Sequence, residues 1–259
     1  MTLPLRIKAP LIFFPALLLS WECAVWLAGA AKIMPYPSGV ALAAIRDIAD
    51  GTLIDAIAGS LRRVITGFAV AALLGVPLGL LMGLVEPVRR ALDPIVDSLR
   101  AIAPIAWIPL ALLWLGIRGN AALFIVAYAA FFPFVLNTIQ AVRLIDRKLV
   151  DAARALGASP FLVLRAVVVP GAVPTVMTGA RIAMAFAWGS IIAAEMAIGI
   201  KVNPGGAATV GLGQLMVSTL YVKRDINGLV LYMLSIGLVS LVIDHGVRAL
   251  QRKATPWQR

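Results

Sequence analysis

Side chains able to do acid–base, nucleophilic or metal chemistry are few in this sequence. It holds one His, one Cys and 12 acidic residues among 259. No acidic cluster accompanies His245 or Cys23 at a spacing typical of a catalytic or metal site. The chain has no Gly-Lys dipeptide and therefore no phosphate-binding loop of the G-x-x-x-x-G-K-[ST] kind. We therefore expect no enzyme activity, no ATPase and no metal site in this chain.

Another group of side chains is notable because it lies within apolar runs, where polar groups are costly and often functional. We take as candidates for a solute path Asn137, Arg181, Trp188 and Glu195. Arg181 and Glu195 would lie about 21 Å apart on one straight helix, so they cannot pair with each other. Alternatives stay open: Arg181 snorkels to the interface, Glu195 meets water at the outer end, and Trp188 packs.

The loop 146–174 carries the most specific local signals. Residues 149–156 are typical of a short helix, and Gly157 suits the C′ position that follows it. Ser159 is a good N-cap, and Pro160 fits the first position of a second helix that runs to about residue 169, before Pro170. A charged helix–turn–helix between two apolar runs favours a docking surface. Its position between membrane spans argues against a DNA-binding motif.

The composition places these residues in a membrane protein. The chain is 61% hydrophobic and 14% charged, and its mean hydropathy is +0.97. Each apolar run is long enough to cross about 30 Å of hydrocarbon. We predict an all-α, polytopic bundle with six spans, over residues 11–31, 64–85, 101–117, 121–142, 173–200 and 226–247. A signal peptide is the alternative for the first, but its apolar length favours a retained helix.

The third predicted span is the shortest and contains Pro104 and Pro109. We expect a kinked helix there, with ends that touch other helices rather than lipid.

The distribution of positive charge predicts the topology. Of the 23 Lys and Arg residues, 14 lie in segments on the side of both termini and eight on the other side. Because Lys and Arg collect in cytoplasmic loops, this favours an N-in, C-in arrangement. The net charge of +11 is then mostly a topology signal, and we expect no nucleic-acid partner. We divide the chain into an N-terminal helix and periplasmic segment (1–55), a membrane domain (56–246) and a cytoplasmic tail (247–259).

Small residues recur at every fourth position of the second span. A stripe of this kind lets two helix backbones approach closely in lipid. It is formed by Gly67, Ala71, Gly75, Gly79 and Gly83. Plain helix packing and a seam within a moving bundle are both consistent with it.

The loop also resembles that of a known family. Asp151-Ala152-Ala153, then Gly157, then Pro170 is similar to the EAA loop of ABC-importer permeases. Further motifs resemble the taurine, alkanesulfonate, nitrate and bicarbonate branch, over roughly residues 35–259. They include Ala106-Trp107-Ile108-Pro109, Phe131-Phe132-Pro133, Ala180-Arg181-Ile182 and Ala194-Glu195-Met196. Two departures are Asp151, where Glu is more usual, and a longer segment at 197–208.

The resemblance implies the type I ABC-importer membrane fold in a bacterial inner membrane. It implies a second permease subunit, expected as a homodimer, and two cytoplasmic ATPase subunits that bind ATP and Mg²⁺. It further implies a periplasmic or lipid-anchored binding protein that delivers a small anionic solute, with taurine or a sulfonate favoured over nitrate, bicarbonate or another small organic solute. Asp151, Ala152, Ala153, Gly157, Ser159 and Pro170 would then form the ATPase-coupling loop, and this chain would bind no cofactor.

Two other classes of protein are alternatives. An ion-coupled secondary transporter would explain the prolines in spans three and four as broken helices, but it predicts internal repeats that we do not find. A membrane-embedded enzyme would need a catalytic constellation that the sequence lacks.

Overall fold

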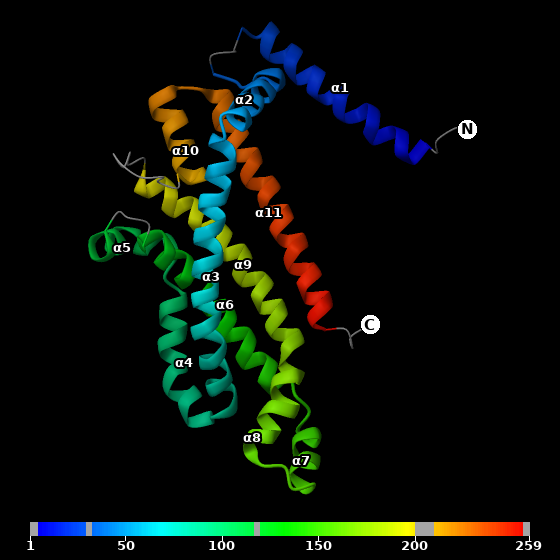
Figure 1. Ribbon diagram of the computed structural model, residues 1–259, viewed down its shortest axis with the longest axis vertical. Helices are drawn as coiled ribbons and strands as arrows, with labels where there is room; N and C mark the ends of the chain where they lie inside the picture. Colours follow the sequence, from blue (N-terminus) through cyan, green and yellow to red (C-terminus); the bar gives the residue numbers. More distant parts are fainter. Residues whose placement is uncertain (1–4, 30–32, 117–119, 200–209, 256–259) are drawn as a thin grey trace. The chain divides into compact units, whose positions relative to one another are not determined.

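The computed structural model describes residues 5–29, 33–116, 120–199 and 210–255, and the regular elements within those ranges are helical (Figure 1). Four helical stretches are long and apolar enough to cross a membrane. They are α3 (Thr52–Leu84), α6 (Asn120–Arg143), the stretch Pro160–Ile198 that ends in α9 (Val169–Ile198), and α11 (Ile226–Ala254). At 33 residues, α3 extends about 50 Å. The all-α, multi-span prediction is confirmed at this level, whereas six spans and an N-in, C-in orientation stay predictions.

The first predicted span corresponds to α1 (Leu5–Leu27). Within the residues whose side chains the structure describes, the stretch Pro15–Leu27 of α1 is an apolar helix, and a complete crossing by α1 stays a prediction. The far end of that prediction, at residues 30 and 31, lies outside the described part of the chain.

Within the third predicted span, 101–117, a 3₁₀ turn η1 (Pro104–Trp107) continues into the short α5 (Ile108–Leu115). The stretch Pro104–Leu115 is too short to cross a membrane alone, and it is long enough only together with the preceding α4 (Glu86–Arg100), so a span at this place stays a prediction. The axes of α4 and of Pro104–Leu115 differ in direction by 84°. Pro104 explains the break, because a residue that precedes proline is pushed out of the helical region, and Ala103 has ψ of 137°.

The helix α4 is strongly two-sided and is not one of the four long apolar helices. Its apolar side, which includes Val96, packs on a core cluster from α3 and α6 that includes Met82, Phe132 and Val135. Its other side carries ion pairs at i,i+3 and i,i+4 spacing. There, hydrogen bonds from Arg89 and Arg90 lower the pKa of Glu86 to about 2.

The chain divides into two compact units. One comprises residues 1–59 and 199–237, and the other comprises residues 60–198 and 238–259. The division falls within α3 and within α11. The boundaries predicted after residues 55 and 246 also fall inside these two helices.

The first unit is joined by polar contacts between α2 (Pro37–Ala49) and the start of α11. The hydroxyl of Tyr232 donates to the buried carboxylate of Asp47. Arg46 pairs with Asp47 at 3.1 Å and with Asp225 at 3.4 Å. This unit also contains α10 (Leu212–Ser218) and a π-helical turn, η3 (Thr219–Lys223).

The second unit is built around α6, which contacts both α3 and α9. Four members of the small-residue stripe approach α6, namely Gly67, Gly75, Gly79 and Gly83, and Ala71 in the same row is buried. A Cβ on Gly79 would lie 2.6 Å from Cβ of Thr138 and 2.7 Å from the carbonyl oxygen of Val135. Only glycine permits this backbone separation. On the other side of α6, Gly179 of α9 packs directly on Asn137.

Candidate functional site

The first helix of the loop is α7 (Arg147–Ala155). Asp146 caps it by accepting a hydrogen bond from the Lys148 amide at 2.9 Å. At its other end Gly157 has φ of +84°. The amide of Gly157 donates to the carbonyl of Arg154, and the amide of Ala158 donates to the carbonyl of Ala153. These two bonds define a Schellman motif, so the prediction for Gly157 is confirmed.

The second helix begins as predicted. Ser159 caps α8 (Pro160–Val163) by accepting from the amide of Leu162 at 3.3 Å, and Pro160 occupies the first turn. The predicted end before Pro170 is wrong, because α8 continues through a π-helical turn, η2 (Leu164–Val168), into α9. The wider π turn removes the close approach of a proline ring to the carbonyl four residues earlier, which would otherwise break the helix.

The loop is anchored on one side and open on the other. Its anchor is an apolar cluster in which Val142, Val163 and Val168 contact Val150 and Ala153. The open side exposes Asp151 and Ala152 together with large apolar side chains, at exposed fractions of 59% for Leu149, 89% for Leu156 and 69% for Phe161. A Cβ on Gly157 would meet no atom of the described chain within 4 Å. The loop therefore presents an ordered, partly apolar surface of the kind that binds another protein.

Two of the proposed path residues are ion-paired, each to a different helix. Glu195 is fully buried, and its carboxylate accepts from Ser60 at 2.9 Å and from Arg63 at 2.7 Å. The expectation that Glu195 meets water is therefore wrong. Arg181 pairs with Asp244 of α11 at 2.7 Å, and Arg248 binds the same carboxylate at 2.6 Å. Neither partner was identified from the sequence, although a charge within a span needs a countercharge and Arg63 lies at the end of the matching apolar run.

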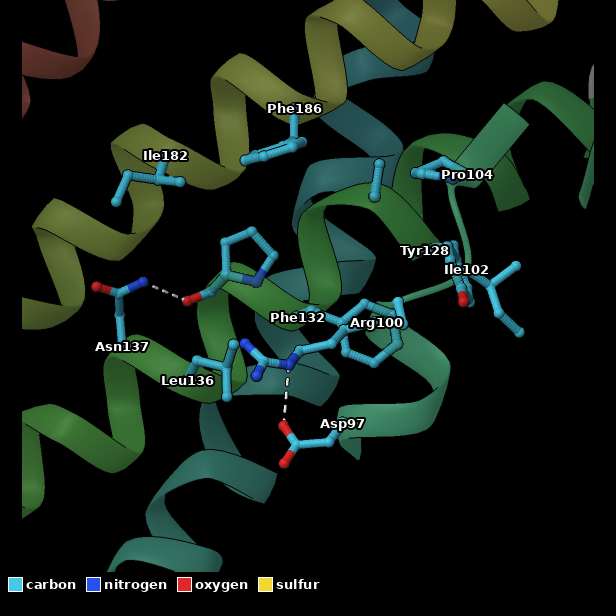
Figure 2. Close-up of a pocket in the computed structure, with 13 residues that line it drawn as sticks. Asp97, Arg100, Ile102, Pro104, Tyr128, Phe132, Leu136, Asn137, Ile182 and Phe186 are labelled. Carbon is cyan, nitrogen blue, oxygen red and sulfur yellow. Dashed lines mark hydrogen bonds and ion pairs between the residues drawn. The ribbon is translucent and has the colours of Figure 1, made fainter. Parts of the chain in front are cut away.

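A pocket of about 510 Å³ lies beside α6 in the second unit. Its walls come from the end of α4, from α6 and from α9, as Figure 2 shows. Asn137 lines it and donates to the carbonyl of Pro133 at 2.8 Å. Trp188 is buried, at 5% exposure. Neither Trp188, Arg181 nor Glu195 is among the lining residues. The path role of these four residues stays a prediction.

Sequence reasoning missed three polar residues of the pocket: Asp97, Arg100 and Tyr128. The sequence did indicate Asp97 and Arg100, because one side of α4 is too polar to face lipid. The packing of the end of α4 against α6, through Val96 and the hydrogen bond from Tyr128 to the Leu99 carbonyl, was not predictable from hydropathy. Within the described ranges, no three His, Cys, Asp or Glu side chains gather where they could hold a metal ion.

Comparisons with known proteins agree on one family. The family model described as "Binding-protein-dependent transport system inner membrane component" matches residues 75–258. A probable ABC transporter permease of Brucella abortus is 35% identical over 88% of this chain and 87% of its own length. The taurine transport system permease protein TauC of Escherichia coli is 34% identical over 80% of this chain and 72% of its own length. A bicarbonate transport system permease protein, CmpB, of Synechococcus elongatus is 37% identical over 74% of this chain and 66% of its own length.

Solved structures show the same fold. An inward-facing form of the MetNI methionine ABC transporter superposes with a TM-score of 0.66 at 21% identity, over 78% of this chain and 96% of the compared chain. An amino acid ABC transporter crystallised with histidines gives a TM-score of 0.62 at 14% identity, over 81% and 97%.

Proposed function

Because the chain belongs to the family of binding-protein-dependent transport system inner membrane components, we propose that it forms the solute path of an ATP-driven importer for a small anionic solute. The chain is a multi-pass membrane subunit of an ABC importer rather than its ATPase. The observation that carries the proposal is the exposed, anchored helix–turn–helix of the loop 146–174, together with the family match. We place it in a bacterial inner membrane with both termini inside.

The loop is proposed as the coupling element. Two ATPase subunits bind ATP and Mg²⁺ in the cytoplasm, and one of them receives α7. Asp151 and Ala152 lie on the proposed surface, and Gly157 and Ser159 form its turn. Ala153 belongs to the apolar anchor, and Pro170 lies in the first turn of α9. The open space around Gly157 and the exposure of Leu156 suit a groove on a partner. A partner that binds one arrangement of the helices more tightly shifts the population toward that arrangement.

The remaining partners follow from the importer class. We propose a second copy of this chain as the other permease subunit and a periplasmic or lipid-anchored binding protein that delivers the solute. Segment 197–208, proposed to face that protein, lies largely outside the described residues. The sequence relationship to TauC supports a taurine-like or sulfonate solute. The relationship to CmpB keeps bicarbonate as the alternative.

The test is purification of the tagged full chain in mild detergent, with mass spectrometry of the proteins that accompany it. We expect a stoichiometric ATPase subunit, and uptake in proteoliposomes that requires both ATP and the binding protein. A chain that purifies alone and transports solute on an ion gradient without ATP would overturn the proposal in favour of a secondary transporter.

A further inference from the structure

The pocket beside α6 contains one ion pair at its α4 wall. Nε of Arg100 lies 2.9 Å from Oδ1 of Asp97, and the two side chains are 49% and 59% exposed. In Figure 2 the Arg100 side chain extends across the pocket, with Ile182 and Phe186 of α9 on the opposite wall. Asp97 and Arg100 are the charged residues among those that line the pocket. The pocket thus offers one positive and one negative group, side by side.

Both charged groups retain unused binding capacity. Within the described ranges, Arg100 forms its ion pair with Asp97, and Asp97 forms no ion pair with another residue. The contact involves Nε of the guanidinium, so the two terminal nitrogens can form a two-point contact with a carboxylate or sulfonate. The second carboxylate oxygen of Asp97 can accept a hydrogen bond from an ammonium group.

The α6 wall adds acceptors to the same pocket. Pro133 has no amide hydrogen, so it cannot donate to the carbonyl of Ala129 as an α-helix requires, and both residues line the pocket. The side-chain nitrogen of Asn137 donates to the Pro133 carbonyl, so the side-chain oxygen of Asn137 points away from that carbonyl and can accept another hydrogen bond. Tyr128 donates to the carbonyl of Leu99 and so ties α6 to the end of α4. Acceptors therefore outnumber donors on this wall.

We propose that this pocket recognises small zwitterions, which carry a sulfonate or carboxylate next to an ammonium, in preference to simple anions. The ligand places its anionic group on the terminal nitrogens of Arg100 and its ammonium on the second carboxylate oxygen of Asp97, and the contact between Nε of Arg100 and Oδ1 of Asp97 is kept. A simple anion gains Arg100 but meets the Asp97 carboxylate, which repels it. The apolar side chains of Phe132, Leu136 and Phe186 surround the carbon chain. This inference rests on the proposed function and narrows its solute class.

The test compares two probes that differ in one group, taurine and isethionate, in which a hydroxyl replaces the ammonium. Equilibrium binding of each labelled probe is measured on the purified complex without its binding protein. We expect taurine to bind at least about tenfold more tightly, which is the gain from one favourable charge contact. Asp97→Asn should abolish that ratio while leaving isethionate unchanged or tighter, and Arg100→Gln should weaken both probes.

A matched pair on the same helix is the control. Arg89 and Asp93 form a 3.3 Å ion pair on α4 but do not line the pocket. Arg89→Gln and Asp93→Asn should leave both affinities unchanged, and thermal unfolding verifies that all four variants fold. Equal binding of taurine and isethionate by the wild type, binding of neither, or an unchanged ratio in Asp97→Asn would each overturn the proposal.

Measuring ATP-dependent uptake distinguishes a wrong zwitterion inference from a wrong proposed function. If ATP-dependent uptake of a solute persists while the probe ratio is insensitive to Asp97, the zwitterion inference alone is wrong. If no ATPase subunit binds the chain and ATP drives no uptake, the proposed function is wrong as well.

Discussion

Arg63 of α3 and Glu195 of α9 meet with 2.7 Å between Nη1 and Oε1, although 132 positions separate them in the sequence. The carboxylate is fully buried, and the Arg63 side chain is 16% exposed. Ser60, one turn before Arg63, supplies a further hydrogen bond to the same carboxylate. The contact joins two long helices through charges that water does not screen.

Removal of the Glu195 charge should destabilise the chain strongly. Glu195→Gln keeps the shape but leaves the Arg63 guanidinium buried without its countercharge, at a cost of about 3–5 kcal/mol in the free energy of unfolding. Denaturant titration in mixed detergent micelles measures this change. The double variant Arg63→Met, Glu195→Leu should recover most of the loss, because no buried charge then lacks a partner. A single variant as stable as the wild type would contradict the buried pair.

Gly79→Ala should weaken the α3–α6 contact. The new Cβ would lie 2.6 Å from Thr138 and 2.7 Å from a backbone oxygen, so the helices must separate. We expect a loss of about 1–3 kcal/mol, typical of overpacking. Gly246→Ala in α11 is the matched control, since its Cβ meets nothing within 4 Å. Because alanine favours helix, that control should be neutral or stabilising. Equal unfolding midpoints for the two variants would argue against a close seam.

Leu156→Asp should release the ATPase subunit without harm to the fold. Leu156 is 89% exposed, so an aspartate there disturbs no packing in this chain but places a charge in the proposed apolar contact. Co-purification of the ATPase subunit should fall roughly tenfold, which corresponds to about 1.4 kcal/mol. Leu250→Asp makes the same change at another exposed leucine, in α11, and should retain the subunit. Undiminished co-purification by Leu156→Asp would remove α7 from the interface.

Two substitutions at Gly157 distinguish the effect of backbone strain from the effect of contact with a partner. Valine at a φ of +84° is strained by about 1–2 kcal/mol, whereas asparagine tolerates positive φ. Gly157→Val should therefore reduce ATP-driven uptake about tenfold, with Gly157→Asn intermediate, while both reach the membrane. If asparagine and valine impair uptake equally, crowding at a partner surface rather than strain is the cause. Intact uptake in both variants would show that this turn plays no part in coupling.

The Arg181–Asp244 contact between α9 and α11 should contribute little to stability. The two side chains are 41% and 31% exposed, so the pair is screened. A double-mutant cycle with Arg181→Gln and Asp244→Asn should give a coupling energy of about 0.2–1 kcal/mol. Arg248→Gln tests the second cation on the same carboxylate, 2.6 Å away. A coupling energy several times larger would indicate that the pair is shielded from water in the assembled complex.

Local signals predicted the loop well and distant contacts poorly. Gly157, Ser159 and Pro160 were assigned correctly because a helix cap depends on four or five neighbouring residues. The same reasoning failed at Pro170, where the π-helical turn before the proline allows the helix to continue. Proline indicates strain in a regular helix, but the sequence does not reveal whether the preceding turn is regular.

The candidate site shows the same division. Asn137 was found because a polar group within an apolar run is conspicuous. Arg100 and Asp97 precede the predicted span 101–117, and hydropathy does not reveal the 84° bend between α4 and Pro104–Leu115 that borders the pocket. Pairing of Glu195 with Arg63 requires the relative position of α3 and α9, and composition carries no such information.

The wide turn at 164–168 also fixes the angular position of everything that follows it. In an α-helix each residue advances by about 100°, so one residue accommodated in a π turn rotates all later side chains by that amount relative to α8. Arg181 and Glu195 reach their partners on α11 and α3 from the same helix, which contains this offset upstream. The π turn therefore sets which way Arg181 and Glu195 point. If it became a regular α-helical turn, both side chains would rotate away from their partners together.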